Sequence, residues 1–284
     1  MYSQSPIPNS YKVVALPGEG IGTEVVPASL TILQKIAEIK GFAVNVNYGL
    51  IGQPALEQLG DYFPEVTAQL CQGADGIVFG AVTKGGLLEL RKRFDFFANL
   101  RPVKVFPSLV NKSSLKPEKV AGIDILFVRE LVSGIYFGAS GRDENDREPY
   151  GYHTMFYRDR EIRRVARIAL EKAQQRRGLL TVAHKENALS HLPWTRLVQE
   201  EARNFPDVMV EGTLVDNLAM QLVTNPHHFD VIVAGNLFGD ILSDLGGALA
   251  GSIGLLGSAS LNSAGFGMYE AIHGTALAIA VLIS

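Results

Sequence analysis

Three aspartates in apolar settings have the side-chain chemistry to hold a metal ion. Asp240 and Asp244 lie four residues apart, shortly after the apolar stretch FDVIVA. On a helix this spacing puts both carboxylates on one face, where they repel unless a cation lies between them. Their hard oxygens suit Mg²⁺ or Mn²⁺. The alternative is a helix-capping Asp240 and a solvated Asp244. Asp216, in LVDNLAMQLV, favours the metal site.

Three arginines in apolar contexts could bind an anion. Arg91 follows LLEL, Arg101 lies in ANLRP, and Arg129 ends IDILFV. Guanidinium groups pair bidentately with carboxylates and stay charged when partly buried. One such arginine is usually structural. Three of them, in a chain that also offers a metal site, predict a substrate with more than one carboxylate.

Lys185 and Tyr136 are candidates for proton transfer. Lys185 follows the apolar stretch TVA by two residues, and a lysine near a divalent cation can have its pKa lowered enough to act as a base. Tyr136, in GIYFG, could donate a proton. Taken singly, a surface lysine and a packed aromatic are the more common roles of such residues.

The elements that must position these residues predict an α/β fold. Apolar stretches at 12–16, 42–48 and 76–79 predict strands, and the apolar spacing from Thr23 to Gly41 predicts a helix. This rhythm is typical of a mostly parallel sheet flanked by helices. The glycines at 18, 20 and 22 do not have the Gly-x-Gly-x-x-Gly spacing of a Rossmann site, so a tight strand–helix turn is predicted.

Composition excludes several other classes. The chain has 284 residues, of which 47% are hydrophobic and 19% charged, so disorder is excluded. Because 26 basic residues face 29 acidic ones, no nucleic-acid partner is expected. Cys71 is the single cysteine, which indicates a reducing compartment. No signal peptide is expected, and the longest apolar run is shorter than the ~20 residues of a membrane span, so we expect a cytoplasmic protein without membrane contact.

Motifs along nearly the whole chain resemble those of the isocitrate/isopropylmalate dehydrogenase family of β-decarboxylating dehydrogenases. The likeness is greatest to its isopropylmalate-oxidising members and runs from Lys12 to about Ala276. The motifs are LPGEGIG at 16, LELRKRFDFFANLRPVKVF at 88, RELVSGIYFG at 129, VDNLAM at 215, GNLFGDILSDLGGALAGSIGLL at 235 and EAIHGTA at 270.

The resemblance implies a role for each candidate residue. The implied catalytic residues are Tyr136, Lys185 and Asp216, and the implied metal ligands are Asp216, Asp240 and Asp244. The implied substrate-binding residues are Arg91, Arg101 and Arg129, with Leu87 and Leu88 against the alkyl group. The implied cofactor-binding residues are Ile21, Glu270, His273, Gly274 and Ala276.

The resemblance also implies a two-domain fold with a non-Rossmann NAD site. Residues 1–98 and 250–284 would form the cofactor-side domain. Residues 99–249 would form the central domain, with the dimer interface and an exposed arm at about 138–152. In the family, the lysine and the first aspartate come from the partner subunit. The implied assembly is therefore a homodimer with shared active sites.

The implied reaction is the metal-dependent oxidative decarboxylation of a 3-substituted malate, with reduction of NAD. The leucines at 87 and 88 favour an apolar substituent, and hence 3-isopropylmalate and its product 2-oxo-4-methylpentanoate, as in leucine biosynthesis. One alternative is a paralogue acting on another 3-alkyl- or 3-arylalkyl-malate, such as benzylmalate. Another is a non-catalytic dimerising homologue, against which the presence of Tyr136, Lys185 and the three aspartates argues.

Two segments depart from the family pattern. Thr83 directly follows Val82 where the family has a longer loop, and Lys84 stands where a glutamate usually lies near the nicotinamide. After Ala276 the family's ribose-binding aspartate is missing, so the choice between NAD and NADP stays open. The chain has either shortened loops with an altered cofactor site, or mobile residues missing from its sequence. We expect the second, because both positions fall in loops predicted to line the cofactor site.

Overall fold

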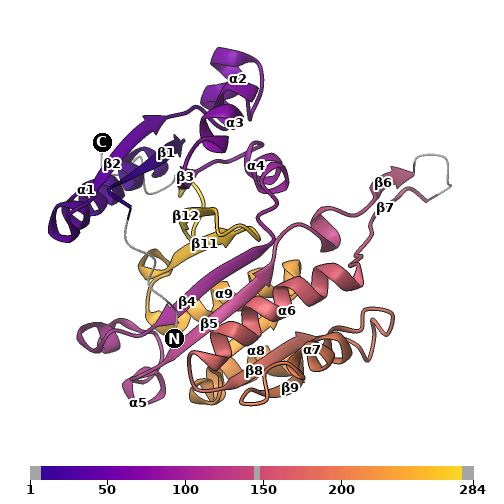
Figure 1. Cartoon of the computed structure of the whole chain (residues 1–284). Helices are drawn as coiled ribbons and strands as arrows, with labels where there is room; N and C mark the ends of the chain where they lie inside the picture. The colour runs from indigo at the N-terminus through magenta and orange to yellow at the C-terminus, as the bar shows by residue number, and fades with distance from the viewer. Residues whose placement is uncertain (1–7, 144–147, 277–284) are drawn as a thin grey trace. The chain divides into compact units, whose positions relative to one another are not determined.

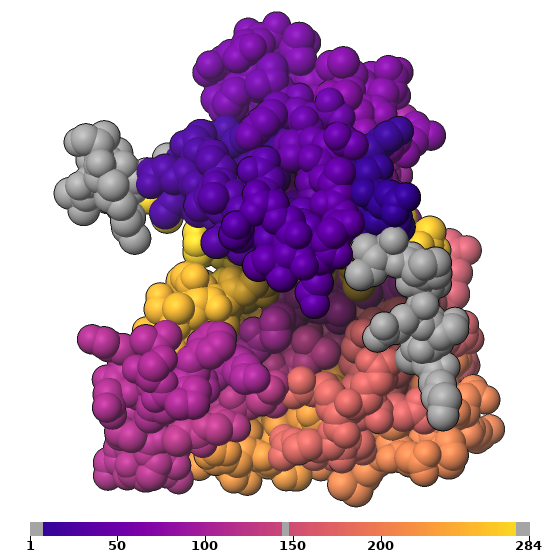
Figure 2. Space-filling model, turned by 60° about the vertical axis from the view of Figure 1, so that its left-hand side comes forward, coloured from indigo at the N-terminus to yellow at the C-terminus, as the bar shows by residue number. Residues whose placement is uncertain are grey.

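The computed structural model describes residues 8–143 and 148–276, and the chain divides into two compact units (Figure 1). The terminal unit contains the described residues up to Asp95 and from Ala259 onward, and the central unit runs from Phe96 to Ser258. In the space-filling view the indigo and violet residues, which belong to the terminal unit, form one continuous body (Figure 2). The first boundary between the units follows Asp95, where the sequence predicted residue 98. The second precedes Ala259, where the sequence predicted residue 250.

The terminal unit is built on parallel strands in the order β2-β1-β3-β12. Val13 and Ala15 of β1 pack against Val26 and Leu30 of helix α1. Helix α1 ends at Lys40 and is followed by Gly41, whose φ of 77° is readily adopted by glycine. Its elements are β1 (Ser10–Gly18), α1 (Gly22–Lys40), β2 (Ala43–Tyr48), α2 (Gln53–Leu59), α3 (Glu65–Gln72), β3 (Gly76–Ala81), α4 (Leu87–Arg93) and β12 (Gly267–Ala271), while β11 (Gly257–Leu261) crosses the unit boundary.

The central unit has strands in the order β4-β5-β10-β8-β9. All neighbours are parallel except β4, which runs antiparallel to β5. Its strands and helices are β4 (Ala98–Lys104), α5 (Pro117–Val120), β5 (Asp124–Glu130), β6 (Ser140–Asp143), β7 (Tyr150–His153), α6 (Asp159–Gln174), β8 (Leu179–His184), α7 (Trp194–Ala202), β9 (Met209–Leu214), α8 (Val215–Thr224), β10 (Val231–Ala234) and α9 (Asn236–Ala250). Short 3₁₀ turns lie at Pro107–Lys112, Gly134–Tyr136, Pro226–His228 and Ile253–Leu255.

Side chains of strand β5 alternate between the face of the sheet that α6 covers and the face that α9 covers. Leu126 and Val128 belong to the core that includes the buried face of α6. Phe127 and Arg129 point to the other face, where Gly246 and Gly239 of α9 approach them. Successive residues of a strand alternate between the faces of a sheet, so the apolar run IDILFV delivers Arg129 to the α9 side.

The predicted mostly parallel α/β architecture is confirmed. Strands β6 and β7 pair as an antiparallel ribbon within the segment where an arm was expected, and most of their residues are exposed. Between residues 8 and 276, the described part contains no helix that is long and apolar enough to span a bilayer. Thr83 follows Val82 in a short connection between β3 and α4, and the second departure from the family pattern begins beyond the described residues.

Candidate active site

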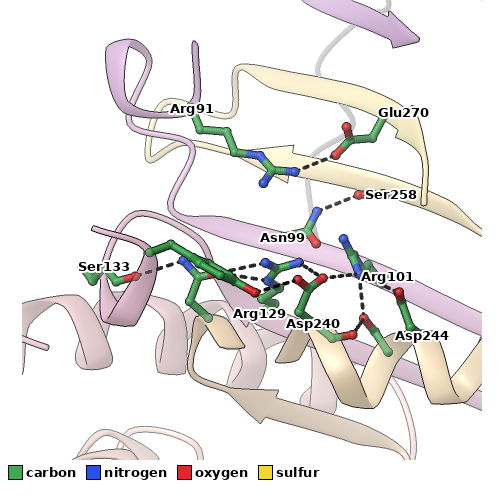
Figure 3. A network of polar contacts seen from close by, with 12 residues as sticks. Arg91, Asn99, Arg101, Arg129, Ser133, Asp240, Asp244, Ser258 and Glu270 are labelled. Carbon is green, nitrogen blue, oxygen red and sulfur yellow. Dashed lines mark hydrogen bonds and ion pairs between the residues drawn. The ribbon is translucent and has the colours of Figure 1, made fainter. Parts of the chain in front are cut away.

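Helix α9 brings Asp240 and Asp244 to one face, as their spacing predicted. The helix begins at Asn236, with Gly235 at its N-cap position, so the alternative of a capping Asp240 is wrong. Asp240 Oδ1 accepts hydrogen bonds from Arg129 Nη1 and, at 3.3 Å, from Arg101 Nη1 (Figure 3). Arg101 Nη1 also lies 3.2 Å from Asp244 Oδ1. Two arginines and two acids therefore form one ion-pair cluster in the central unit.

The arginines of this cluster are buried and its acids face solvent. The side chains of Arg101 and Arg129 are 6% and 4% exposed, whereas that of Asp244 is 51% exposed. A buried guanidinium is tolerated when its charge and its N–H groups are paired. Asp240 and Asp244 pair the charges of both arginines through their Nη1 atoms and hold them at an accessible surface, while the buried Nε of Arg101 has no hydrogen-bond partner among the described residues.

Gly239 explains how Arg129 lies so close to the helix. A Cβ atom on Gly239 would lie 2.8 Å from Arg129 Cγ and 2.9 Å from its Cβ. Glycine lowers helix propensity by ~1 kcal/mol relative to alanine. Here it permits the close approach of β5 and α9 that lets Arg129 reach Asp240.

Tyr136 joins the same cluster. Its hydroxyl donates to Asp240 Oδ2 at 3.2 Å from the 3₁₀ turn Gly134–Tyr136, which follows β5. Burial, and then the nearby Asp240 carboxylate, raise the pKa of the Tyr136 hydroxyl above its ordinary value. The tyrosine hydroxyl is protonated at neutral pH, as tyrosines ordinarily are, and can act as a proton donor.

Two further residues in the cluster were missed by the sequence analysis. Asn236 Oδ1 accepts from Arg129 Nε at 3.1 Å and Nη2 at 2.9 Å, and Ser243 Oγ accepts from Arg101 Nη1 at 2.8 Å. Asn236 is four residues before Asp240, which places it on the same helix face. That spacing is the signal that could have found it.

Lys185 and Asp216 form a separate pair in the central unit. Lys185 follows β8, Asp216 lies in the first turn of α8, and Nζ is 2.8 Å from Oδ2. The hydrogen bond from Lys185 holds the pKa of Asp216 below its ordinary value. In the described ranges no three His, Cys, Asp or Glu side chains of one chain are grouped as metal ligands. Asp240 and Asp244 thus come together without Asp216.

Arg91 lies in the terminal unit, where it pairs with a residue that the resemblance assigns to the cofactor site. Its Nη2 is 3.2 Å from Oε1 of Glu270, and both side chains are less than 10% exposed (Figure 3). Arg91 is in the last turn of α4, and Glu270 is in β12. Leu87 and Leu88 begin α4, with Leu88 exposed and Leu87 half-buried.

Backbone hydrogen bonds hold the glycine turn that follows β1. The N–H of Glu19 donates to Ala81 O at 2.8 Å, and that of Gly22 donates to Glu19 O. Gly18 has a φ of 66°, and a Cβ there would lie 2.0 Å from Ala81 O. These N–H groups bind within the unit, which is the tight turn predicted in place of a Rossmann phosphate site.

The same turn anchors the segment that contains His273 and Gly274. The N–H of Ile21 donates to Thr275 O at 3.0 Å, and His273 Nδ1 lies 2.9 Å from Gly274 O. Ala276 is one of two described non-glycine residues with positive φ. The terminal unit therefore brings the motifs LPGEGIG and EAIHGTA into direct contact.

The fold and the cluster define an α/β protein whose buried arginines meet surface carboxylates, an arrangement suited to anionic ligands. The family model described as isocitrate/isopropylmalate dehydrogenase matches residues 12–282. The chain therefore belongs to this family of NAD-dependent decarboxylating dehydrogenases, and the resemblance found in its motifs is confirmed.

Relatives and solved structures agree with this assignment. The chain is 46% identical to a 3-isopropylmalate dehydrogenase of Carboxydothermus hydrogenoformans, over 95% of this chain and 76% of the relative. It is 45% identical to that of Aquifex aeolicus, over 95% and 78%. Among solved structures, isocitrate dehydrogenase from Methylococcus capsulatus matches with a TM-score of 0.83 and 29% identity, over 95% of this chain and 79% of that one. A β-decarboxylating dehydrogenase from Thermococcus kodakarensis matches with 0.76 and 32%, over 95% and 77%.

Proposed function

We propose that this protein oxidises and decarboxylates a 3-substituted malate, with 3-isopropylmalate as the substrate, and that it reduces NAD in a step of leucine biosynthesis. The observation that carries the proposal is the cluster in which Arg101, Arg129 and Tyr136 all contact Asp240. It combines cations for substrate carboxylates, a proton donor and acids for a divalent ion. The names of the relatives at about 45% identity support the substrate.

Arg101 and Arg129 bind the carboxylates of the malate. Their guanidinium groups are held by buried contacts to Ser243 and Asn236, which orient them before substrate arrives. Preorganised donors lose little conformational entropy when a ligand binds. We also propose Arg91 as a third guanidinium for the substrate, and Leu87 and Leu88 as contacts of its apolar C3 substituent.

Asp240 and Asp244 have the donor chemistry that Mg²⁺ or Mn²⁺ requires, namely hard carboxylate oxygens. Because each chain gathers two acids at the cluster and keeps Asp216 beside Lys185, we infer that Asp216 and Lys185 act in the site of a second subunit. Asp240 and Asp244 would hold such an ion, and Arg101 and Arg129 would then be available to the substrate carboxylates. The bound ion would polarise the C2 hydroxyl and lower its pKa.

The chain's own residues move two protons. Lys185 takes the proton of the C2 hydroxyl, directly or through water, while the hydride leaves C2. The C3 carboxylate then leaves as CO₂, and its bonding electrons form the enolate of the product. Tyr136 gives its proton to C3 of that enolate, which yields the 2-oxo acid. NAD⁺ accepts the hydride when bound.

The cofactor site belongs to the terminal unit in this proposal. Glu270, His273, Gly274 and Ala276 lie in one segment that is tied to the glycine turn. Ile21 contributes its side chain, because its N–H already donates to Thr275 O. This segment supplies contacts to NAD without a Rossmann phosphate turn.

The test is a spectrophotometric assay of nicotinamide reduction with a panel of 3-substituted malates. Reduction that requires Mg²⁺ or Mn²⁺ and is fastest with 3-isopropylmalate is the expected result. A faster rate with benzylmalate would overturn the substrate assignment. Lys185→Ala should lose turnover without losing the fold, and the exposed Lys104→Ala is the matched control. Absence of reduction with every malate and either ion would show a non-catalytic homologue.

A further inference from the structure

Asn236 contacts both the guanidinium of Arg129 and the turn that carries Tyr136. Its side-chain oxygen accepts two N–H groups of Arg129, at 3.1 and 2.9 Å. Its side-chain amide donates to the backbone oxygen of Ser133 at 2.9 Å. Asn236 is 1% exposed, so these contacts are made away from water. The buried Asn236 amide is therefore hydrogen-bonded both to Arg129 and to the turn that carries Tyr136, and both residues have a role in the proposed reaction.

Arg129 is held between two residues of the same helix. Asn236 binds its Nε and Nη2 atoms, and Asp240 binds its Nη1 atom. Because Asn236 and Asp240 lie about one helical turn apart, together they bind all three nitrogens of the planar guanidinium. When Asp240 turns away to another partner, Asn236 still fixes the orientation of the guanidinium.

The turn that carries Tyr136 is fixed from two sides. The buried Glu130 carboxylate accepts the N–H groups of Val132 and Ser133, at 2.9 and 3.0 Å. The amide of Asn236 holds the opposite edge of the turn through Ser133 O. The position of Tyr136 relative to α9 thus depends on Asn236 as well as on its own bond to Asp240.

Tyr157 holds Asn236 itself. Its hydroxyl oxygen accepts the backbone N–H of Asn236 at 2.8 Å. A Cβ atom on Gly134 would lie 2.3 Å from this hydroxyl, and one on Gly235 would lie 2.7 Å from it. Glycine at both positions lets the tyrosine reach the first residue of α9. The contact anchors the backbone of Asn236 at the start of α9, from which its side chain reaches Arg129 and Ser133 O.

We infer that Asn236 is a positioning residue, which keeps the substrate-binding Arg129 and the proton donor Tyr136 in a fixed mutual arrangement. This inference rests on the proposed function for its catalytic consequence. Its structural part, that the amide immobilises the turn at 131–137, can be measured without any substrate.

Two variants separate the two contacts of the amide. Asn236→Asp keeps an acceptor for Arg129 but loses the donor to Ser133 O, whereas Asn236→Ala loses both. Loss of the bonds to the charged guanidinium in Asn236→Ala changes an equilibrium about 10- to 100-fold, and Asn236→Asp replaces the donor to Ser133 O by a buried carboxylate oxygen that repels it. We expect Asn236→Asp to lower kcat at least about tenfold with KM changed less than about threefold. We expect Asn236→Ala to lower kcat and also to raise KM at least about tenfold.

The matched control is Leu249→Ala, a fully buried residue at the other end of α9. It should lower the melting temperature and leave kcat and KM at their wild-type values. A positioning role is overturned if Asn236→Asp has the wild-type kcat. It is also overturned if Leu249→Ala reduces kcat as much as the Asn236 variants do, because loss of stability would then explain the effect.

Hydrogen exchange separates failure of this inference from failure of the proposed function. Backbone amides at 131–137 should exchange faster in both Asn236 variants than in wild type and in Leu249→Ala. Unchanged exchange in Asn236→Ala overturns the inference, whether or not the wild type oxidises a malate. Faster exchange in a protein that oxidises none would overturn the proposed function and leave the immobilising contact established.

Discussion

A single nitrogen of Arg101 joins Asp240 and Asp244. Nη1 lies 3.3 Å from one carboxylate and 3.2 Å from the other. Two like charges at this helical spacing repel, and the buried guanidinium offsets that repulsion. The arginine occupies the electrostatic role that a divalent cation would take between the same acids. We therefore expect substrate and a divalent ion to compete with these arginine–acid pairs.

The fork of the Arg129 guanidinium should be essential for binding a dicarboxylate. Lysine keeps the charge in Arg129→Lys but cannot pair with Asn236 and a carboxylate in the same plane. We expect kcat/KM for the malate to fall about 100-fold or more. Steady-state kinetics measures this, with Arg196→Lys as the control, because Arg196 is an exposed arginine bound to Glu200. An equal loss in both variants would contradict the prediction.

Mixing two inactive variants tests whether the active site is shared. In the proposed dimer, one site of an Asp240→Asn and Lys185→Ala heterodimer contains both wild-type residues. If subunits combine at random, half of the dimers are mixed and each has one intact site of two, so about a quarter of wild-type activity should return. Co-expression of the two variants and an assay of the unfractionated dimers measure this, and the mixed dimer isolated with two affinity tags should have about half of wild-type activity. Activity that stays at the level of the parent variants would show that each chain builds its own site.

Divalent ions should stabilise the central unit through the acids of α9. A ligand that binds the folded state at 100 times its Kd adds ~2.7 kcal/mol to the free energy of unfolding. We expect Mg²⁺ or Mn²⁺ to raise the melting temperature of the wild-type protein, and EDTA to reverse the shift. Asp244→Asn should reduce this response, and the exposed Asp61→Asn should not. A shift of the same size in Asp244→Asn would place the ion elsewhere.

Glu130 should make stability depend on pH. Burial raises the pKa of its carboxyl to about 7, against an ordinary value of 4.5. The folded state therefore binds more protons than the unfolded state between these values, and the free energy of unfolding falls as pH rises from about 5 to 7. The slope from this one group is at most ~1.4 kcal/mol per pH unit.

The variant Glu130→Gln does not titrate and should lose this component of the slope. Urea unfolding at pH 5, 6 and 7 compares the two proteins. The variant also loses one of the two backbone contacts of the carboxylate, so its stability is lower at every pH, and the slope is the diagnostic quantity. Parallel pH dependence in both proteins would show that Glu130 is ionised throughout.

The sequence by itself determined the features that follow from local periodicity. The alternation in IDILFV put Arg129 on one face of β5, and the four-residue spacing put Asp240 and Asp244 on one face of α9. The glycine spacing excluded a Rossmann turn, and the strand–helix rhythm predicted the parallel α/β fold. Each of these depends on neighbours within a few residues, where strand and helix geometry fix the direction of a side chain.

Tertiary structure alone decided which side chains meet. Asn236 and Arg129 are 107 residues apart, and Arg91 and Glu270 are 179 apart. No periodicity relates such residues, because their contact depends on how closely β5 and α9, or α4 and β12, pack together. The pairing of Lys185 with Asp216, away from Asp240, has the same origin. The sequence motifs predicted most residues of the cluster, and tertiary packing determined with which residue each buried charge pairs.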